Sequence, residues 1–365
     1  MKVLHIIARV NQGGTARWIN TLIRGLREAG LEVYLAAGEV GDDEKEDDTY
    51  QELGGIRIAG LGRSISPFSD LKALLGTRRT IKKMQPDILC THTAKAGVVG
   101  RIASITLGSR RPYLVHTVHG HLLYGYFSPW KTQLVILIER FLARRTDVII
   151  AAGENVRDEL LAKGIGQRDQ YVVIRPGVEP LILIEKFAAR KSLGIPQDAF
   201  VVGWLGRFER VKRPDRVIEI AQALPEVQFL MGGDGSLRER ISMAAPPNVK
   251  VVGWTTPELI WGASDAALLT SENEAQPISL IEAGLAGLPS VAQHVGSVSE
   301  VVEDGSTGYL VRRCEEAISH LREMKSHTEI VRTMGATAHD HVARQFSVKS
   351  FVLNHIKVYK DGIEN

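Results

Sequence analysis

The sequence has little of what marks secreted, membrane-spanning or nucleic-acid-binding proteins. Its 365 residues include only two cysteines, Cys90 and Cys314, so no disulfide framework is readable and a reducing compartment is expected. A formal net charge of +3 does not indicate a nucleic-acid partner. No apolar run reaches the roughly 18 residues that span a bilayer, and the N-terminus lacks the features of a signal peptide. We therefore expect a cytoplasmic protein that contacts a membrane only peripherally, at its inner face.

The rest of the composition is typical of a folded enzyme. Apolar residues make up 44% and charged residues 24% of the chain, which is ordinary for a globular protein. A chain of this length exceeds one ordinary core, and we expect two domains with a cleft between them. Short β-rich runs alternate with helical patterns throughout, and this alternation predicts an α/β fold with parallel sheets of βαβ units.

Two series of strands are predicted, with a break at Arg175-Pro176-Gly177 and a hinge near residue 178. We expect one Rossmann-like domain over residues 1–178 and a second over residues 179–346, with a final helix, 347–365, that packs back on the first. The predicted strands are 3–7, 32–37, 87–92, 113–120, 148–153 and 171–174, then the runs FVVGWLGRF, VQFLMGGDG, VKVVGW, AALLTSE, PSVAQHVG and GYLV.

Charged residues gather in the N-terminal half. The acidic run from Asp42 to Asp48 follows a predicted strand, and we interpret it as a solvated loop and not as a metal site. The basic clusters are candidates to face an anionic membrane surface. Their members are Arg78, Arg79, Lys82, Lys83, Arg110, Arg111, Arg140, Arg144 and Arg145.

Glycine-rich loops follow two of the strands, at the sheet edge where open α/β sheets bind ligands. Gly13 and Gly14 precede a helix whose free N–H groups and dipole favour an anion. Such a pair is more often a plain turn, and it is not the GxGxxG fingerprint of dehydrogenases. The segment Gly232-Gly233-Asp234-Gly235 is interpreted as a structural turn.

Two further loops carry the charges that a nucleotide ligand would need. Arg207 and Lys212 stand five residues apart on one loop and can neutralise a diphosphate leaving group from two sides; alone, they would indicate a solvated loop. Pro277 suits a first helical position, which predicts Glu274 in the preceding loop and Glu282 about one and a half turns into the helix. Carboxylates so spaced can accept hydrogen bonds from separate hydroxyls, whereas either one alone would be an ordinary surface residue.

A cluster of histidines ends one strand of the N-terminal half, at His116, His119 and His121. Strand alternation sends His116 and His119 to opposite faces, and no carboxylate or cysteine completes a metal shell. We therefore predict no metal site here. The favoured interpretation is that His119 alone donates or accepts a hydrogen bond at the cleft.

Together these loops resemble family 4 of the retaining glycosyltransferases, which have the two-domain GT-B architecture. The likeness covers nearly the whole chain, and its most specific part is SENEAQPISLIEAGLAGLPSVA, which holds Glu274 and Glu282. GRFERVKRP and EVVEDGSTGYLV flank it in the expected order, and Gly13-Gly14 and TVHGH match the family's glycine and histidine loops. The stretch ISPFSDLKALLGTRRTIKKMQPDILCTHTAKAGVVGR is similar to enzymes that build bacterial capsule, O-antigen or other lipid-linked glycans.

The resemblance implies that the second domain binds the nucleotide sugar. Arg207 and Lys212 would bind the diphosphate of a UDP-sugar, or less readily a GDP-sugar. Glu282 would hold the ribose and Glu274 the hydroxyls of the donor sugar. The backbone of Gln276, Pro277 and Ile278 would approach the sugar and the distal phosphate.

The resemblance also implies roles for the first domain, which would bind the acceptor. His119 would reach the donor sugar and help to position the reacting centre, and Gly13 and Gly14 would leave room for a phosphate. The aromatic residues after the histidine loop would either seat a polyprenyl-linked acceptor at a membrane interface or pack in the core. These aromatic residues are Tyr124, Tyr126, Phe127 and Trp130.

Three positions depart from the family pattern. Ala275 and Ser297 stand where glycines are frequent, and Gln276 stands where an aromatic or apolar residue is common. A methyl group at position 275 would crowd the donor if the backbone there had a positive φ. The departures therefore bear on sugar specificity more than on the reaction.

The predicted reaction is the transfer of a hexose or N-acetylhexosamine to a hydroxyl of a glycan or lipid-linked sugar, with retention of configuration. The departing phosphate would accept the proton of the acceptor hydroxyl, so no metal and no other cofactor is expected. Two alternatives stay open. One is a nucleotide-sugar epimerase on the same architecture, and the other is a sugar-nucleotide-binding protein without turnover.

Overall fold

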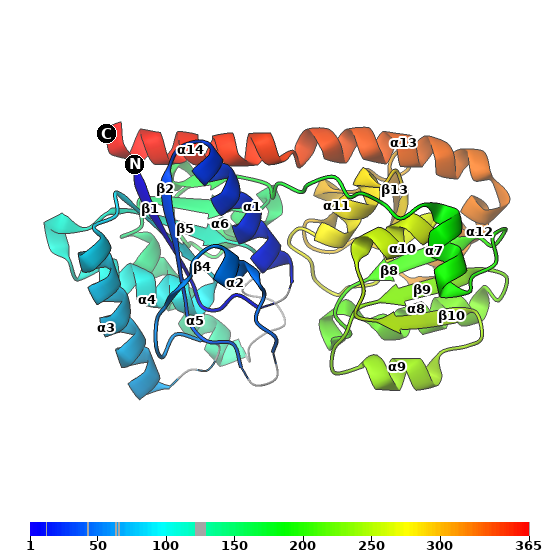
Figure 1. Cartoon of the computed structure of the whole chain (residues 1–365), viewed down its shortest axis with the longest axis horizontal. Helices are drawn as coiled ribbons and strands as arrows, with labels where there is room; N and C mark the ends of the chain where they lie inside the picture. The colour runs from blue at the N-terminus through cyan, green and yellow to red at the C-terminus, as the bar shows by residue number, and fades with distance from the viewer. Residues whose placement is uncertain (12, 42–43, 63, 65, 121–128, 365) are drawn as a thin grey trace. The chain divides into compact units, whose positions relative to one another are not determined.

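The computed structural model describes residues 1–11, 13–41, 44–62, 64, 66–120 and 129–364. The contacts between residues divide the chain into two compact units (Figure 1). Unit 1 comprises Met1–Gly177 and Val348–Asn365, and unit 2 comprises Val178–Ser347. The division therefore falls after Gly177, and the last helix belongs to unit 1.

Unit 1 is built on a parallel sheet of seven strands in the order β3-β2-β1-β4-β5-β6-β7. The order turns back at β1, where β2 and β4 pair on either side. Every strand predicted for this half is present, and the two-residue β3 is an addition. The strands are β1 (Lys2–Ile7), β2 (Glu32–Ala37), β3 (Ile56–Arg57), β4 (Ile88–His92), β5 (Tyr113–Val118), β6 (Val148–Ala151) and β7 (Tyr171–Val173).

Helices cover both faces of this sheet, which explains why its strands are apolar along their whole length. On one face, buried residues of α1 and α14 share a core with alternate residues of β1, β4 and β5. On the other face, α3 and α4 pack in a second core. The helices of the unit are α1 (Gly14–Glu28), α2 (Thr49–Glu52), α3 (Pro67–Met84), α4 (Ala94–Ile105), α5 (Pro129–Ala143), α6 (Glu154–Ala162) and α14 (Val348–Glu364), with single turns η1 (Gly108–Arg110) and η2 (Arg168–Gln170).

Two glutamates of the acidic run that the sequence suggested was solvated form ion pairs. Arg9 Nη2 donates to Glu44 Oε1 at 2.8 Å, and Arg57 pairs with Glu46 at 2.9 Å. Two glutamates of the acidic run, Glu44 and Glu46, are thus paired with arginines, whereas Asp48 is exposed. Asp42 and Asp43 lie outside the described residues.

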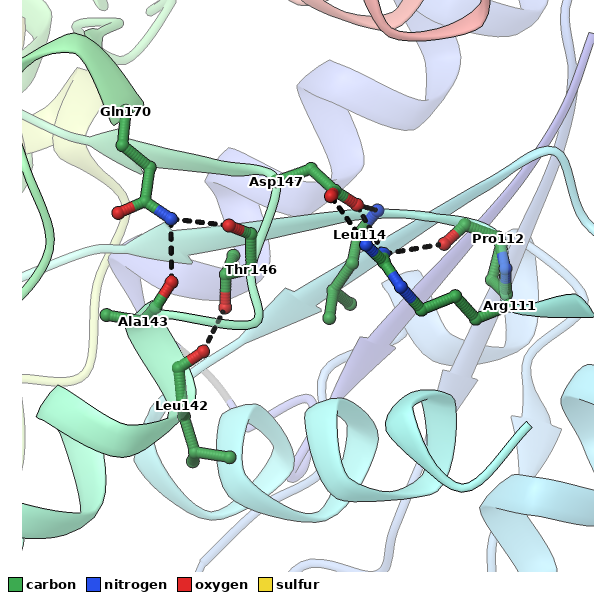
Figure 2. Close-up of polar contacts among 8 residues, drawn as sticks. All are labelled: Arg111, Pro112, Leu114, Leu142, Ala143, Thr146, Asp147 and Gln170. Carbon is green, nitrogen blue, oxygen red and sulfur yellow. Dashed lines mark hydrogen bonds and ion pairs between the residues drawn. The ribbon is translucent and has the colours of Figure 1, made fainter. Parts of the chain in front are cut away.

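At the amino ends of β5 and β6, Asp147 joins two strands (Figure 2). Its carboxylate accepts from Arg111 Nη2 at 2.7 Å and from the backbone N–H of Leu114 at 2.7 Å. Arg111 is therefore neutralised inside the fold, and Arg140 likewise donates to the carbonyl of Lys163 at 2.7 Å. The ion pair offsets the charge of Arg111, whereas Arg140 stays exposed.

Unit 2 holds a parallel sheet of six strands in the order β10-β9-β8-β11-β12-β13, which turns back at β8. The strands are β8 (Val201–Leu205), β9 (Gln228–Gly232), β10 (Val249–Gly253), β11 (Ala266–Leu269), β12 (Ser290–Gln293) and β13 (Gly308–Val311). The helices are α7 (Lys186–Leu193), α8 (Pro214–Ala223), α9 (Arg238–Ala244), α10 (Pro257–Ala263), α11 (Ile278–Leu285), α12 (Cys314–Ser326) and α13 (Thr328–Gln345), with turns η3 (Arg210–Lys212) and η4 (Val298–Glu300). All six strands lie within the predicted runs.

None of the helices in the described ranges combines the length and the apolar composition that crossing a membrane requires.

Candidate functional site

Two charged candidates of unit 2, Lys212 and Glu274, meet where its strand order turns back. β8 and β11 are adjacent in the sheet, and the loop that follows each carries one partner of an ion pair. Lys212 Nζ donates to Glu274 Oε1 at 2.5 Å. Ligands of open α/β sheets bind at such switch points, so the fold brings this pair to the edge where a ligand is expected.

Glu274 is held by two donors on one oxygen. Besides Lys212, the hydroxyl of Ser271 donates to Oε1 at 2.6 Å, and only 8% of Glu274 is exposed. No partner of Oε2 occurs among the described residues. The carboxylate is thus fixed in direction by Lys212 and Ser271 and keeps one oxygen for a ligand. We name these three residues the lysine–glutamate clamp.

The two loops of the clamp are joined by a hydrogen bond from a side chain to the backbone. The hydroxyl of Thr270 donates to the carbonyl of Lys212 at 2.9 Å, and the indole N–H of Trp204 donates to that hydroxyl at 3.0 Å. Arg213, directly after Lys212, adopts the left-handed conformation with φ 49°, and it pairs with Glu272 at 2.8 Å. A non-glycine residue in this region costs about 1–3 kcal/mol and persists only where its surroundings impose it.

Arg207 lies at the start of the same loop but outside the clamp. Its side chain is exposed, and it has no hydrogen bond or ion pair with any residue that the structure describes. The glycine turn after β9 packs against the loop that carries Arg207. Gly233, with φ 129°, lies so close to Gly206 that an added Cβ would stand 1.9 Å from the Gly206 carbonyl oxygen. This close approach is a structural use of the turn, as the sequence suggested.

The remaining donor-site candidates lie around the start of α11. Pro277 is the residue before the helix and not its first residue, so the helix begins at Ile278, one position later than the sequence indicated. Glu282 follows one turn later and is 3% exposed. Ala275 is absent from the residues with positive φ, so its methyl group is compatible with the backbone and the predicted crowding does not arise from conformation.

Two buried polar atoms beside Glu274 lack a partner among the described residues. One is Gln276 Oε1, although Gln276 Nε2 donates to Glu300 at 3.2 Å. The other is the hydroxyl oxygen of Ser297, whose backbone N–H donates to the Glu274 carbonyl at 3.0 Å. Buried polar groups normally have partners, so these atoms indicate a place for ligand or water next to the clamp.

In unit 1, the predicted glycine loop begins α1. Gly13 precedes the helix with φ 147°, a conformation that favours glycine, and Gly14 is its first residue. Apart from its neighbours in the sequence, no described residue has an atom within 4 Å of the position where a Cβ of Gly13 would stand. The space over Gly13 is therefore open to a ligand atom.

His119 also lies at the carboxyl edge of the unit 1 sheet, just after β5. Its Nε2 contacts His92 Nδ1 at 3.0 Å, and the ring of Trp18 packs perpendicular to it with centroids 4.5 Å apart. His116 points to the other face, toward Gly97 of α4, as strand alternation predicted. Desolvation lowers the pKa of His119 to about 3, so the ring is neutral at physiological pH.

The described residues contain no group of three or more His, Cys, Asp or Glu side chains arranged to hold a metal ion. Of the aromatic residues considered for the acceptor, Trp130 is exposed on α5. Tyr124, Tyr126 and Phe127, together with His121, lie outside the described residues.

Comparison with known proteins matches both halves of the chain to glycosyltransferases. Residues 13–177 match the model of the glycosyl transferase 4-like domain, and residues 185–340 match that of the glycosyl transferases group 1. The chain belongs to the family 4 glycosyltransferases. Its function is therefore glycosyl transfer, and the two matched segments correspond to units 1 and 2.

Two curated bacterial proteins are similar to this glycosyltransferase. The UDP-Gal:alpha-D-GlcNAc-diphosphoundecaprenol alpha-1,3-galactosyltransferase of Escherichia coli is 29% identical over 280 residues, which is 70% of each chain. The capsular polysaccharide biosynthesis glycosyltransferase CapM of Staphylococcus aureus is 25% identical over 350 residues, covering 89% of this chain and 90% of CapM. By their names, the first relative transfers galactose to a diphosphoundecaprenol-linked sugar and the second acts in capsular polysaccharide biosynthesis.

The fold of this glycosyltransferase is GT-B. A crystal structure of Anabaena HepE in complex with UDP and glucose superposes with a TM-score of 0.84 at 21% identity, over 99% of this chain and all of that one. The sequence prediction of a GT-B glycosyltransferase with two parallel-sheet α/β domains is thus confirmed.

The glycosyltransferase also has candidate site residues that the sequence did not single out. Thr270 and Ser271 lie in the predicted strand run AALLTSE, but nothing in their spacing reveals which atoms they contact. His5 and His92 lie within apolar strands, and a histidine in such a run is the one signal that was available. The contact between His5 and His92 depends on the pairing of β1 with β4, which the pattern of either strand alone does not reveal.

Proposed function

We propose that this glycosyltransferase transfers a hexose or N-acetylhexosamine from a UDP-sugar to a hydroxyl of a lipid-linked sugar, with retention of configuration and without a metal ion. The lysine–glutamate clamp is the observation that carries the proposal. A GDP-sugar is the less favoured donor.

The leaving diphosphate is the group that most needs stabilisation as the glycosidic bond breaks. Lys212 has donors to spare beyond its bond to Glu274, because an ammonium carries three. Arg207 has no partner among the described residues, so its five donors are available. Two cations on one loop, next to helix termini, supply the positive charge that magnesium supplies in other transferases, which supports a metal-independent reaction.

The donor sugar would be held by the free carboxylate oxygen of Glu274. Its other oxygen is occupied by Lys212 and Ser271, so the free one has a fixed direction, which favours accepting from a pair of sugar hydroxyls. The unpartnered Gln276 Oε1 is a further acceptor close by in sequence. Glu282 remains the candidate for the ribose, and the backbone of Pro277 and Ile278 the candidate for the distal phosphate.

Retention is proposed from the family resemblance, and because the clamp leaves no good nucleophile, we propose substitution on one face of the sugar in place of double displacement. The carboxylate of Glu274 is paired with an ammonium and a hydroxyl, which lowers its nucleophilicity. In the proposed step the bond from the anomeric carbon to the phosphate oxygen breaks, and the acceptor oxygen bonds to the same face. The acceptor's proton passes to the departing phosphate oxygen, so charge and atoms balance without a protein base.

A UDP-sugar and a lipid-linked acceptor are favoured by the relatives. The E. coli relative uses, by its name, UDP-galactose and a GlcNAc-diphosphoundecaprenol acceptor, and HepE was crystallised with UDP and glucose. Such acceptors lie in a membrane, so the enzyme would work at the inner face of the cell membrane as a peripheral protein.

Two helices of unit 1 offer a surface for that contact. α3 exposes Phe68, Leu71 and Leu75, and Phe68 is 87% exposed. α5 exposes a second row at helical spacing, consisting of Trp130, Leu134, Leu137, Ile138 and Phe141. Exposed apolar rows of this size mark interaction surfaces.

Basic residues continue the row of α3 toward the end of the helix. α3 ends in Arg78, Arg79, Lys82 and Lys83, and Arg78, Lys82 and Arg110 line a pocket of about 750 Å³. Apolar side chains followed by cations suit a bilayer interface with anionic phospholipid headgroups. We therefore propose that α3 and α5 rest on an anionic membrane.

A donor panel tests the chemistry. UDP- and GDP-sugars are screened for thermal stabilisation, and stabilising donors are then incubated with polyprenyl-diphosphate-linked sugars. The proposal expects transfer from a UDP-sugar, an α-linkage from an α-donor by NMR, and full activity in EDTA. An inverted linkage would contradict retention, and loss of activity in EDTA would contradict metal independence. Release of an epimerised nucleotide sugar without acceptor would instead identify an epimerase.

Vesicle flotation tests the membrane surface. Trp130→Ser should reduce binding to vesicles containing phosphatidylglycerol severalfold, whereas Trp254→Ser in unit 2 is the matched control, because the two tryptophans are 66% and 60% exposed. Binding to vesicles of phosphatidylcholine alone should be weak. Equal binding of both variants and wild type would refute this surface.

A further inference from the structure

Three histidines from neighbouring strands of unit 1 form one hydrogen-bonded chain. His5 Nδ1 lies 2.9 Å from His92 Nε2, and His92 Nδ1 lies 3.0 Å from His119 Nε2. His5 on β1 and His92 on β4 are fully buried, and His119 after β5 is partly exposed. Because Nε2 of His119 is occupied, the ring nitrogen left for a ligand is Nδ1. We call His5, His92 and His119 the histidine chain.

All three rings are neutral at physiological pH. Desolvation lowers the pKa of His5 and of His119 to about 3 and that of His92 well below its ordinary value. A neutral imidazole carries one proton, so one nitrogen donates and the other accepts. The hydrogen bonds of the histidine chain can therefore all be donated toward His119 or all be donated toward His5.

The buried end of the chain distinguishes these directions. If the protons point outward, His5 Nδ1–H donates to His92, His92 Nδ1–H donates to His119, and a lone pair remains on His5 Nε2. If they point inward, His5 Nε2 carries a buried N–H. His5 Nε2 has no partner among the described residues. An unpaired buried N–H is rarer and costs more free energy than an unpaired buried lone pair. The outward direction is therefore favoured.

The two other buried histidines of unit 1 have the same tautomer. His355 Nδ1 lies 2.8 Å from the carbonyl oxygen of Phe351, which only accepts, so Nδ1 carries the proton and the buried, unpartnered Nε2 is a lone pair. The Thr91 hydroxyl donates to the Val115 carbonyl at 3.3 Å, so it accepts from His116 Nδ1 at 2.9 Å. The core of unit 1 thus contains a second buried Nε2 without a partner among the described residues, that of His355.

We propose that His5 and His92 are positioning residues that fix His119 as its Nδ1–H tautomer, so that His119 presents a neutral hydrogen-bond donor to an oxygen of the bound sugar. This inference rests on the proposed function for its substrate but not for its tautomer. Trp18, perpendicular to the ring of His119, holds the plane of that ring. With its proton on Nδ1 and its lone pair occupied by His92, His119 cannot act as a general base.

The tautomer is measured directly on the unliganded protein. In long-range proton–nitrogen correlation spectra of ¹⁵N-histidine-labelled protein at pH 8, we expect the Nδ1 resonance of His119 to be that of a protonated nitrogen and Nε2 that of an unprotonated one. The spectrum of His119→Phe assigns the resonances. A protonated Nε2 on His119 overturns the proposal, whatever the enzyme's substrate.

Two variants of His92 test the positioning role. The amide nitrogen of His92→Asn can occupy the place of Nδ1 and still donate to His119, whereas His92→Leu keeps the bulk and loses the donor. We expect kcat to fall about tenfold or more in His92→Leu, with a smaller change in KM, and to recover largely in His92→Asn. His355→Leu is the matched control for removal of a buried histidine outside the chain.

The outcomes separate this inference from the proposed function. If His119→Ala impairs transfer but His92→Leu does not, the positioning role is refuted while the proposed function stands. If His119→Ala leaves transfer unchanged, the sugar contact is refuted, and the clamp of unit 2 still decides the function. If His92→Leu does not fold, the wild-type spectrum alone decides the tautomer.

Discussion

The two units place their candidate residues at the same topological position, but these residues are charged in unit 2 and neutral in unit 1. In unit 2, the switch point between β8 and β11 carries the lysine–glutamate clamp, a charged pair at 2.5 Å with further cations beside it. In unit 1, the switch point between β1 and β4 carries the histidine chain, which is neutral and is buried except at the partly exposed His119. The fold therefore dictates where a ligand binds, and the side chains decide whether it meets charge or a neutral donor.

This contrast fits a division of labour in glycosyl transfer. Charge belongs where the diphosphate departs, because negative charge develops there. A neutral donor suits the sugar, whose oxygens carry no full charge.

Loss of the carboxylate should have the largest effect. We expect Glu274→Gln to lower kcat/KM by about 100-fold or more, because the neutral amide neither pairs with Lys212 nor accepts from two hydroxyls as a carboxylate does. Steady-state kinetics on the best donor give the ratio. Glu272→Gln is the control, since Glu272 lies two residues away and pairs with Arg213 outside the clamp. Similar activity in both variants would contradict the role of Glu274.

Acid should weaken unit 1. His5, His119 and His355 have pKa values of about 3, 3 and 4 in the fold, against 6.5 when exposed. The unfolded state binds protons first, so stability is complete above about pH 6.5 and is lost as the pH falls toward 3–4. At pH 5 each such histidine costs about 2 kcal/mol. Hydrogen exchange, corrected for the intrinsic rate, should show loss of protection in α1, α14 and β1, and unchanged protection there at pH 5 would contradict this.

Removal of the Ser271 hydroxyl should have a moderate effect. Ser271→Ala deletes one of the two donors to Glu274 Oε1, and a hydrogen bond to a charged group is worth about 1.5–3 kcal/mol. We expect roughly a tenfold loss in kcat/KM, with the thermal midpoint nearly unchanged because Lys212 remains. Ser279→Ala on α11 serves as the control. A loss as large as that of Glu274→Gln would show that Ser271 does more than orient the carboxylate.

Relief of strain should have the smallest effect. Thr93 follows His92 with φ 64°, a conformation that only glycine adopts readily. Its hydroxyl accepts from the backbone N–H of Ala8 at 3.4 Å, a long and weak bond. Thr93→Gly should therefore change the thermal midpoint by no more than a few degrees, whereas Thr93→Val keeps the strain and loses the bond. Strong destabilisation by glycine alone would contradict a strained Thr93.

Much of the fold was predictable because its strands are buried on both faces and read as continuous apolar runs. Of the strands among the described residues, twelve coincide with predicted segments, and β1 begins one residue earlier than predicted, at Lys2. The exception, β3, consists of Ile56 and Arg57, too short for any periodicity. The start of α11 was predicted one residue early because Pro277 fits both the first helical position and the residue before it.

The candidate site was predictable in residue type and loop but not in contact. The spacing of Arg207 and Lys212 suggested two equivalent cations, whereas Lys212 joins the clamp and Arg207 stays outside it. His5 and His92 escaped notice because their contact requires the register that sets His5 beside Cys90 and Ile7 beside His92. Such pairings arise between distant segments, and no local pattern encodes them.

Binding of UDP to the clamp is the most direct test of the account. Isothermal titration of wild type, Lys212→Ala and Arg210→Ala compares two cations of one loop, of which Arg210 is exposed and has no role in the clamp. The account predicts that Lys212→Ala keeps its fold and loses UDP affinity by about 50-fold or more, while Arg210→Ala binds like wild type. Equal affinity of wild type and Lys212→Ala would contradict it.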